Sequence, residues 1–160
     1  MRVEHPIPPY VPENAKILIL GSFPSVKSRE QMFFYGHPKN RFWKVLAALC
    51  NEEEPQSVEN KKKLLSSHGV ALYDVIDSCE ITGSADNTIR DVKPSDISKI
   101  ISHSCVERIF LNGMTAKKYY DKLLLKTVGI EGVLLPSTSP ANAAVSLDKL
   151  IEIWREKIIS

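Results

Sequence analysis

The segment of residues 16–46, KILILGSFPSVKSREQMFFYGHPKNRFWKVL, joins a short apolar run to a long aromatic loop and the start of a helix. The apolar run ends abruptly at Gly21, as expected of a parallel strand that is covered on both faces. The loop over residues 22–40 is long for a compact domain. It holds four aromatic residues, Phe23, Phe33, Phe34 and Tyr35, which argue against disorder. We therefore expect a buried strand that leads the chain into a pocket.

Outside this segment, apolar runs and helical patterns alternate along the chain. Continuous apolar runs predict strands over residues 16–20, 70–75, 106–111 and 133–135. Apolar spacing predicts helices over residues 41–50, 57–67, 95–103, 115–126 and 146–158, with Ser95 and Ser146 as N-caps and Gly69 as a stop signal. Residues 1–15 contain four prolines and should be extended, and residues 77–94 should form a polar loop.

Strands that alternate with helices are typical of a parallel sheet wrapped by helices on both faces. The predicted fold class is therefore α/β, a three-layer α/β/α architecture around a central, mostly parallel four-stranded sheet. The 160 residues are expected to form a single domain, residues 1–160.

Composition and spacing exclude several classes of protein. The apolar runs reach only about four to six residues, far short of the roughly 18 that cross a bilayer, and the first residues lack the apolar core of a signal peptide. We expect a cytoplasmic protein without membrane contact. Cys50, Cys79 and Cys105 form no CxxC motif, and none of the four histidines has a carboxylate or cysteine at ligand spacing. We therefore expect no metal and no cofactor.

Polar residues follow each predicted strand at its carboxyl end, where ligands bind in open parallel sheets. The four endings are Gly21-Ser22, Tyr73-Asp74, Asn112-Gly113 and residues 136–139, PSTS. They lack the GxSxG spacing of a nucleophile elbow and the glycine patterns of phosphate loops. The groups that these four strand endings and the aromatic loop do offer are amides, hydroxyls, one carboxylate and aromatic rings. Such a set suits a planar ring that stacks on aromatic side chains and is read along its hydrogen-bonding edge.

Three blocks of sequence carry a resemblance to a known family: GSFPS at residues 21–25, YGHPKNRFWK at residues 35–44 and LPSTSPAN at residues 135–142. Together they resemble the uracil-DNA glycosylase superfamily, and the second block is similar to the HPxNRFWK block of its mismatch-specific uracil and thymine branch. With SADNTI at residues 84–89, Arg90-Asp91 and residues 94–97, PSDI, the set most resembles the deoxyinosine (hypoxanthine) DNA glycosylase branch. The resemblance extends over nearly the whole chain.

Two positions depart from the pattern of that superfamily. Most members carry Asp or Asn before the proline of the first block, GSFPS, which is motif one of the superfamily. That residue positions the attacking water, and this chain has Phe23 in its place. The last block commonly supplies a His that donates to the base, and the matching stretch here begins with Ser137. The resemblance to the hypoxanthine branch implies that Asn40 carries much of the catalysis instead.

The resemblance also implies a set of binding residues, each with an ordinary structural alternative. Asn40 is the predicted catalytic residue, or else a helix N-cap. Tyr35 should stack on the flipped base, or else pack within its loop. The predicted base-binding residues are Gly21, Ser22, Phe23, Tyr35, Asp74 and Asn112, and the predicted DNA-binding residues are Ser25, His37, Ser137, Thr138, Ser139, Pro140, Ala141 and Asn142. The alternative role is core packing for Phe23 and a helix cap or salt bridge for Asp74. For Asn112 it is turn formation. For His37 and for the serine-rich loop, residues 137–142, it is ordinary loop structure.

The resulting hypothesis is a monomeric, monofunctional DNA glycosylase of base excision repair that hydrolyses the N-glycosidic bond of deoxyinosine in DNA. A first alternative keeps the reaction and changes the base to uracil, alone or in mismatches. A second alternative, of another class, is a non-catalytic nucleic-acid or nucleotide binder on the same fold, because the motif-one carboxylate or carboxamide is missing.

Overall fold

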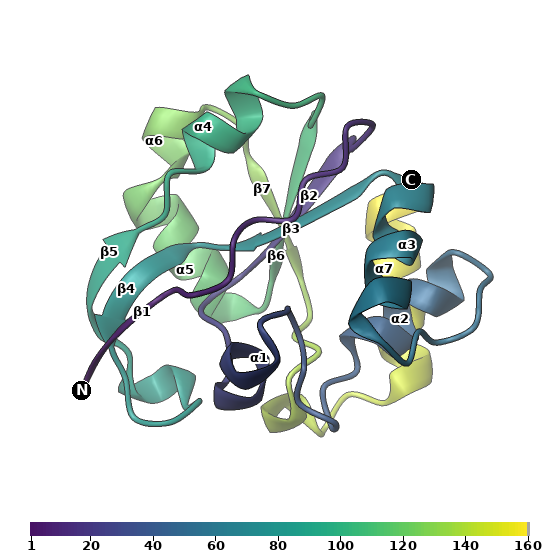
Figure 1. Ribbon diagram of the computed structural model, residues 1–160, viewed down its shortest axis with the longest axis horizontal. Coiled ribbons are helices and arrows are strands. Elements are labelled where there is room, and N and C mark those ends of the chain that lie inside the picture. Colours follow the sequence, from purple (N-terminus) through teal and green to yellow (C-terminus); the bar gives the residue numbers. More distant parts are fainter. Residues whose placement is uncertain (160) are drawn as a thin grey trace.

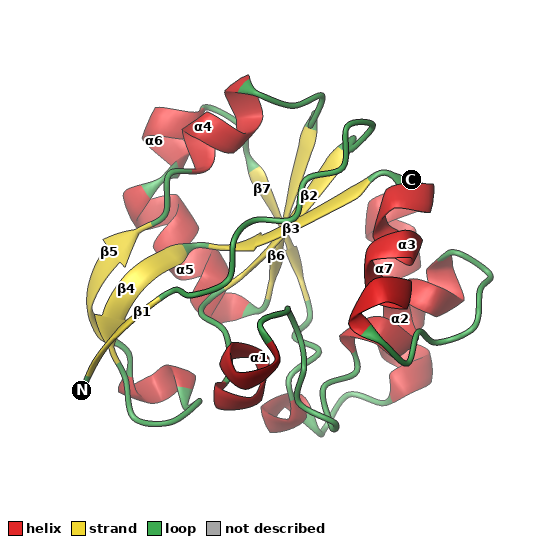
Figure 2. Ribbon diagram, in the orientation of Figure 1, coloured by secondary structure: helices red, strands yellow, loops and turns green. Residues whose placement is uncertain are grey.

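The computed structural model describes residues 1–159, and its centre is a sheet of four parallel strands in the order β3-β2-β6-β7 (Figures 1 and 2). The strands are β2 (Ile17–Gly21), β3 (Val70–Asp74), β6 (Arg108–Asn112) and β7 (Gly132–Leu135). Residues 18–20 of β2 are all fully buried, which explains why the strand reads as a continuous apolar run. The predicted central sheet is confirmed.

Helices cover both faces of this sheet, so the predicted three-layer architecture is also confirmed (Figure 1). One face packs Ile19, Leu72 and Phe110 against the side of the molecule that holds α2 (Phe42–Leu49), α3 (Val58–His68) and α7 (Leu147–Ile159). The other face packs Leu18 and Ile109 against the side that holds α4 (Ile97–Ser102), α5 (Met114–Leu123) and α6 (Leu125–Val128).

A second sheet corrects the prediction that residues 77–94 form a polar loop. Strands β4 (Ile76–Glu80) and β5 (Arg90–Pro94) pair antiparallel, and β1 (Arg2–Glu4) adds to the other edge of β4. A 3₁₀ turn, η1 (Asp86–Thr88), lies between β4 and β5. The β4–β5 register shifts twice, and such bulges disrupt the period-two alternation by which a strand is recognised in sequence.

Several helix boundaries differ from those predicted. A short helix, α1 (Val26–Gln31), begins inside the predicted long loop and is capped by Ser25. Asp96 caps α4 in place of the predicted Ser95, which is buried. The predicted helix over residues 115–126 divides into α5 and α6 at Leu124. The other two signals are confirmed, because Gly69 ends α3 in the left-handed conformation and the Ser146 hydroxyl accepts the Lys149 N–H at 3.1 Å.

The chain before β2 is extended, as its prolines predict, and crosses from one sheet to the other. It begins as β1 beside β4 and then forms an antiparallel bridge between Tyr10 and Leu72, at the outer edge of β3. This path carries His5 beneath the carboxyl end of β3. Within residues 1–159, no helix combines the length and apolar character needed to span a membrane.

Candidate functional site

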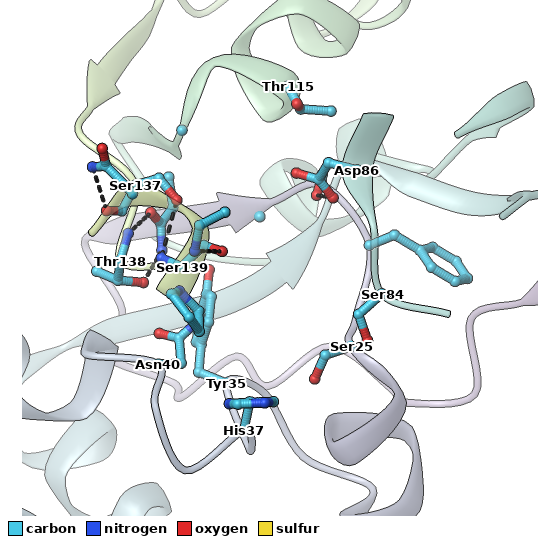
Figure 3. Close-up of a pocket in the computed structure, with 18 of the residues that line it drawn as sticks. Ser25, Tyr35, His37, Asn40, Ser84, Asp86, Thr115, Ser137, Thr138 and Ser139 are labelled. Atoms are coloured by element: carbon cyan, nitrogen blue, oxygen red, sulfur yellow. Dashed lines mark hydrogen bonds between the residues drawn. The ribbon is translucent and has the colours of Figure 1, made fainter. Parts of the chain in front are cut away.

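A cavity of about 890 Å³ opens at the carboxyl ends of the parallel strands. This volume lies within the usual range of small-molecule sites, about 300–1,000 Å³. Fifteen residues were singled out from the sequence, and all of them line this cavity: Gly21, Ser22, Phe23, Ser25, Tyr35, His37, Asn40, Asp74, Asn112, Ser137, Thr138, Ser139, Pro140, Ala141 and Asn142 (Figure 3). The structure thus brings together segments from five separate parts of the chain.

Asp74 ends β3 at the floor of the cavity, where its carboxylate is held by a buried histidine. Asp74 is 3% exposed, and the His5 Nε2–H donates to its Oδ2 at 2.7 Å. The Ile7 N–H donates to His5 Nδ1 at 3.2 Å. Because Nδ1 accepts a proton donor, the ring is the neutral tautomer with its hydrogen on Nε2. Asp74 Oδ2 is therefore held by His5, and Oδ1 remains available as a hydrogen-bond acceptor.

Asp74 Oδ1 lies against the backbone of Gly21, its neighbour in the β2–β3 register. A Cβ at position 21 would lie 2.5 Å from Asp74 Oδ1 and 3.0 Å from the Tyr35 hydroxyl oxygen. Only glycine permits this approach of backbone, carboxylate and phenol. The absence of a side chain at Gly21 thus leaves room for the Asp74 carboxylate and the Tyr35 hydroxyl, which any larger residue at this position would displace.

Tyr35 presents an unusual phenol to the cavity. Its ring stacks on Phe42 with centroids 4.1 Å apart and planes inclined by 15°, so only the opposite face is left for another ring. Its buried hydroxyl has no hydrogen-bond partner among residues 1–159. Burial first, and then the Asp74 carboxylate, raise the pKa of Tyr35; the nearby Asn112 amide opposes this but lies outside hydrogen-bond geometry. The phenol therefore stays protonated and is free to donate.

The Asn40 side chain caps α2 with its oxygen and leaves its amino group without a partner among the hydrogen bonds of residues 1–159. Its Oδ1 accepts the Phe42 N–H at 2.9 Å, so the carboxamide oxygen serves the first turn of α2. The backbone cap position falls on Arg41. Because the oxygen is committed to a backbone donor, the amide orientation is fixed and the amino group is the part available to the cavity. A capping oxygen and a donating amino group are compatible in one side chain.

Asn112 is tied to the serine-rich loop more closely than its predicted base-binding role required. Its Nδ2 donates to Thr138 Oγ1 at 3.0 Å, and its Oδ1 accepts the Thr138 N–H at 3.1 Å. One amide hydrogen of Asn112 is left. Thr138 is fully buried, so this pair anchors the loop to the end of β6. Gly113 follows with φ of 101°, where a Cβ would lie 3.2 Å from that of Ser137.

The side chains of the serine-rich loop, residues 137–142, hydrogen-bond to its own backbone. Ser137 accepts the Ser139 N–H at 3.0 Å, and Ser139 accepts the Ala141 N–H at 3.2 Å. The Arg41 guanidinium donates to the carbonyls of Val145 and Asn142, at 2.6 and 2.9 Å. Pro140 and Ala141 are exposed at the cavity rim. The loop that the sequence assigned to DNA is therefore locked to the loop that carries Asn40.

His37 and Ser25 complete the predicted set. His37 Nδ1 accepts the Lys39 N–H at 3.1 Å, which leaves the hydrogen of the neutral ring on Nε2. The Ser25 hydroxyl accepts the Ser28 N–H at 3.1 Å and so caps α1. Both residues lie on the same side of the cavity mouth (Figure 3).

Several residues that line the cavity were not predicted from the sequence, and Asp86 is the carboxylate among them. The Ser22 hydroxyl donates to Asp86 Oδ1 at 3.0 Å. Asp86 is exposed toward the open cavity. Partial desolvation between the cavity walls, and then the Asp74 carboxylate, raise the pKa of Asp86, whereas the hydroxyls of Ser22 and Thr115 lower it. Asp86 lies in the SADNTI block that contributed to the family resemblance, which was the only signal for it.

Two other features were missed for different reasons. Met114 lines the cavity and is 68% exposed, and because it is apolar the pattern of polar residues at the strand ends does not indicate it. The sequence offers no carboxylate at ligand spacing from His5, and its partner Asp74 lies 69 residues away. Across residues 1–159, no three His, Cys, Asp or Glu side chains form a group able to hold a metal ion.

Comparison with known proteins identifies the family of this chain. The family model described as the uracil DNA glycosylase superfamily matches residues 8–157. The chain belongs to the uracil DNA glycosylase superfamily. This confirms the resemblance inferred from the GSFPS, HPKNRFWK and LPSTSPAN blocks.

Individual relatives agree with this membership. A hypoxanthine DNA glycosylase of Methanosarcina acetivorans is 33% identical over 149 residues, covering 92% of this chain and 93% of the relative. Another of the same name, from Methanosarcina barkeri, is 31% identical over 137 residues, covering 84% and 85%. A solution NMR structure from M. acetivorans, described as a candidate uracil DNA glycosylase, superposes with a TM-score of 0.80 at 32% identity over 98% of both chains. The predicted enzyme class, a DNA glycosylase, is confirmed.

Within this uracil DNA glycosylase fold, the departure at Phe23 has a structural explanation. The Phe23 side chain is 8% exposed and packs edge-on against the His5 ring, with centroids 5.8 Å apart. The Arg29 guanidinium lies 5.6 Å from the centre of its ring. The phenyl group therefore belongs to the core that supports the His5–Asp74 pair.

Proposed function

We propose that this DNA glycosylase excises hypoxanthine from deoxyinosine in DNA, as a monofunctional and monomeric enzyme of base excision repair. The observation that carries the proposal is the complementary pair of free groups in the cavity. Asp74 offers an acceptor oxygen at the floor, and Asn40 offers an amino group whose oxygen is already committed to α2. The names of the relatives from M. acetivorans and M. barkeri support the same substrate.

An acceptor beside a donor matches the edge that deamination creates. Hypoxanthine presents an N1–H donor next to its O6 acceptor, whereas adenine presents the reverse pattern, an N1 acceptor beside an amino group. Adenine would therefore set its N1 lone pair against the Asp74 carboxylate and its amino group against that of Asn40. A site built for hydrogen-bonding groups rejects a ligand that leaves them unpaired.

Guanine shares the N1–H and O6 of hypoxanthine, so edge recognition alone does not exclude it. The base must first leave the duplex, and a mismatched or damaged pair is the least costly to open. Discrimination against guanine in a G·C pair therefore rests partly on the flipping step. This reasoning favours deoxyinosine opposite thymine or cytosine as the substrate.

Uracil is the second candidate base, because it also places an N–H donor beside a carbonyl acceptor, and the family as a whole is named for it. The two bases differ in size rather than in edge chemistry. Stacking on the free face of Tyr35 favours the larger purine, because more ring area is covered. The cavity of about 890 Å³ has room for either base.

The reaction proceeds by departure of the base from the sugar. The nucleotide rotates into the cavity, where its base stacks on Tyr35 and hydrogen-bonds with Asp74 and Asn40. The bond between C1′ and N9 breaks toward an oxocarbenium-like sugar, and its electron pair leaves with the base. Asn40 and the protonated Tyr35 phenol donate to the charge that develops on the base. No lysine is among the described residues lining the cavity, which supports hydrolysis without a Schiff-base intermediate.

A panel of duplexes tests this proposal under single-turnover conditions. Each duplex carries one deoxyinosine, deoxyuridine, mismatched thymine or deoxyxanthosine, and the released base is identified by mass. We expect hypoxanthine to be released fastest, and we expect no strand cleavage before alkali treatment. Faster uracil release would favour the second candidate base. DNA binding without any abasic product would favour a non-catalytic binder.

A further inference from the structure

The proposed reaction needs a water molecule held against C1′, and the groups assigned so far leave none to hold it. Phe23 replaces the usual motif-one carboxylate or carboxamide with a hydrocarbon ring. One oxygen of Asp74 is held by His5 and the other faces the base edge, while the Asn40 oxygen accepts the Phe42 N–H. The water therefore requires a basic oxygen elsewhere in the cavity.

Asp86 is a second carboxylate in this cavity, and its turn is fixed at three points. The Ser22 hydroxyl donates to Asp86 Oδ1 at 3.0 Å, and Ser22 belongs to the same GSFPS block as Phe23. The Val26 N–H donates to the Ser84 hydroxyl at 2.9 Å. The Arg29 guanidinium donates to the Gly83 carbonyl at 3.2 Å. The β4–β5 connection is thus anchored to α1 and to the end of β2.

The position of Asp86 relative to Asn40 suits hydrolysis. Figure 3 shows Asp86 and Ser84 on one wall of the cavity, and Asn40 with residues 137–139 on the other. A sugar between these walls has the donor for the departing base on one side and a carboxylate on the other. None of the ion pairs among residues 1–159 includes Asp86, so no cation competes for its free oxygen.

We propose that Asp86 is the catalytic carboxylate that holds and deprotonates the attacking water, taking over from another element the function that the motif-one residue has in most of the superfamily. This inference rests on the proposed glycosylase reaction. Ser22 is a positioning residue, because it orients Asp86 rather than contacting the substrate. A motif-one serine thus keeps the water site in place although the motif-one carboxylate is absent.

The chemistry balances as a simple hydrolysis. As the C1′–N9 bond breaks, the oxygen of the water bonds to C1′ and one water proton passes to the free oxygen of Asp86. The base takes up a proton from solvent, and Asp86 later returns its proton to solvent. Before the bond breaks, the same carboxylate stabilises the positive charge that develops on the sugar. A carboxylate with a raised pKa is the better base for this step.

Substitution of Asp86 by Asn tests the proposal, because Asn keeps the shape and an oxygen that accepts from Ser22. With deoxyinosine duplex in single turnover, Asp86→Asn is expected to slow hypoxanthine release about 100-fold or more, as removal of a general base does. Ser22→Ala should slow it less, by about 10-fold. Asp91→Asn is the matched control, because Asp91 lies in the same segment but pairs with Arg2 outside the cavity; its rate should equal that of the wild type.

Binding distinguishes catalysis from a structural role. A duplex with 2′-fluoro-deoxyinosine resists cleavage and reports affinity alone. Asp86→Asn should bind it at least as tightly as the wild type, because a negative charge is removed near the DNA phosphates. Weaker binding in parallel with slower release would make Asp86 a structural residue and overturn the proposal. An unchanged release rate would overturn it as well.

Failure of the Asp86 role and failure of the glycosylase function give different results. A wild-type protein that releases hypoxanthine while Asp86→Asn does so equally fast removes only the role of Asp86. If the wild type releases another base of the panel, the Asp86 variants are measured with that base and the same criteria apply. If it releases no base, the glycosylase proposal fails and the water-binding role fails with it.

Discussion

His5 and Asp74 lie 69 residues apart in sequence and form a buried hydrogen bond of 2.7 Å at the floor of the cavity. Their side chains are 0% and 5% exposed. The Ile7 N–H determines which ring nitrogen of His5 carries the hydrogen. An extended N-terminal segment, outside the central sheet, thus orients the carboxylate proposed to read the base.

Removal of His5 should therefore affect both stability and activity. His5→Ala leaves a buried carboxylate oxygen without its donor, and hydrogen bonds to charged groups contribute about 1.5–3 kcal/mol. We expect the free energy of unfolding to fall by about 3 kcal/mol and hypoxanthine release to slow. His5→Gln, whose amide reaches the place of Nε2, should recover much of both. Urea unfolding and single-turnover assays measure the two effects.

His103→Ala provides the control for that experiment, since His103 is exposed and bonds only within α4 and its end. Its free energy of unfolding should change by no more than about 0.5 kcal/mol. If His5→Ala were as stable and as active as this control, the His5–Asp74 pair would have no part in the site.

Tyr35 offers two separable contributions, a ring and a hydroxyl. Tyr35→Phe removes only the unpartnered donor, and loss of one hydrogen bond of about 1 kcal/mol should reduce release about fivefold. Tyr35→Ala also removes the stacking surface, for which aromatic–base contacts of about 1–3 kcal/mol predict a loss of 10-fold to over 100-fold. Tyr10→Phe is the control, because its hydroxyl bonds Ser66 away from the cavity. Equal losses in Tyr35→Phe and Tyr35→Ala would rule out stacking.

The pH dependence of base release should report the ionisation of Asp86. The carboxylate acts only when deprotonated, and its pKa is raised by partial desolvation in the cavity and by Asp74, against the hydroxyls of Ser22 and Thr115. The rate should therefore fall as the pH drops through this raised value, at a higher pH than an ordinary aspartate would give. The Arg29 guanidinium donates to the Gly83 carbonyl, and none of the ion pairs among residues 1–159 joins it to Asp86.

Variants identify the residue that causes this fall in rate at low pH, the acid limb of the pH profile. Asp86→Asn should be slow at every pH and lose this dependence at low pH, whereas Asp91→Asn, whose carboxylate pairs with Arg2 outside the cavity, should keep it. Measurement of single-turnover rates over a range of pH makes the comparison. Persistence of the limb in Asp86→Asn would assign it to another group.

The features that the sequence predicted correctly depend on local pattern and on one topological rule. The apolar run before Gly21 and the capping signals at Gly69 and Ser146 have short-range causes. The carboxyl ends of parallel strands must meet at one edge, and this rule was sufficient to gather Asp74 and Asn112 into the cavity.

The features that escaped prediction depend on contacts between distant segments. No local pattern joins His5 to Asp74, because the pairing arises only when β1 adds to the second sheet. Strand β4 was hidden by its two register shifts. Asp86 lies on a 3₁₀ turn without periodicity, and its importance follows only from the approach of Ser22.

The amino group of Asn40 is the central chemical claim, and a matched pair of variants separates it from the capping oxygen. Asn40→Asp keeps an oxygen for the Phe42 N–H but removes the donor, whereas Asn40→Ala removes both. Loss of one such donor typically costs about 100- to 1,000-fold in rate. Asn60→Ala, on the exposed surface of α3, should leave the rate unchanged.

The decisive measurement is the mass-detected, single-turnover release of hypoxanthine from deoxyinosine duplex by the wild type and by Asn40→Asp. We expect the wild type to release hypoxanthine and Asn40→Asp to release it at least about 100-fold more slowly, with the fold intact by circular dichroism. Release by Asn40→Asp at the wild-type rate would show that the amino group of Asn40 has no part in catalysis.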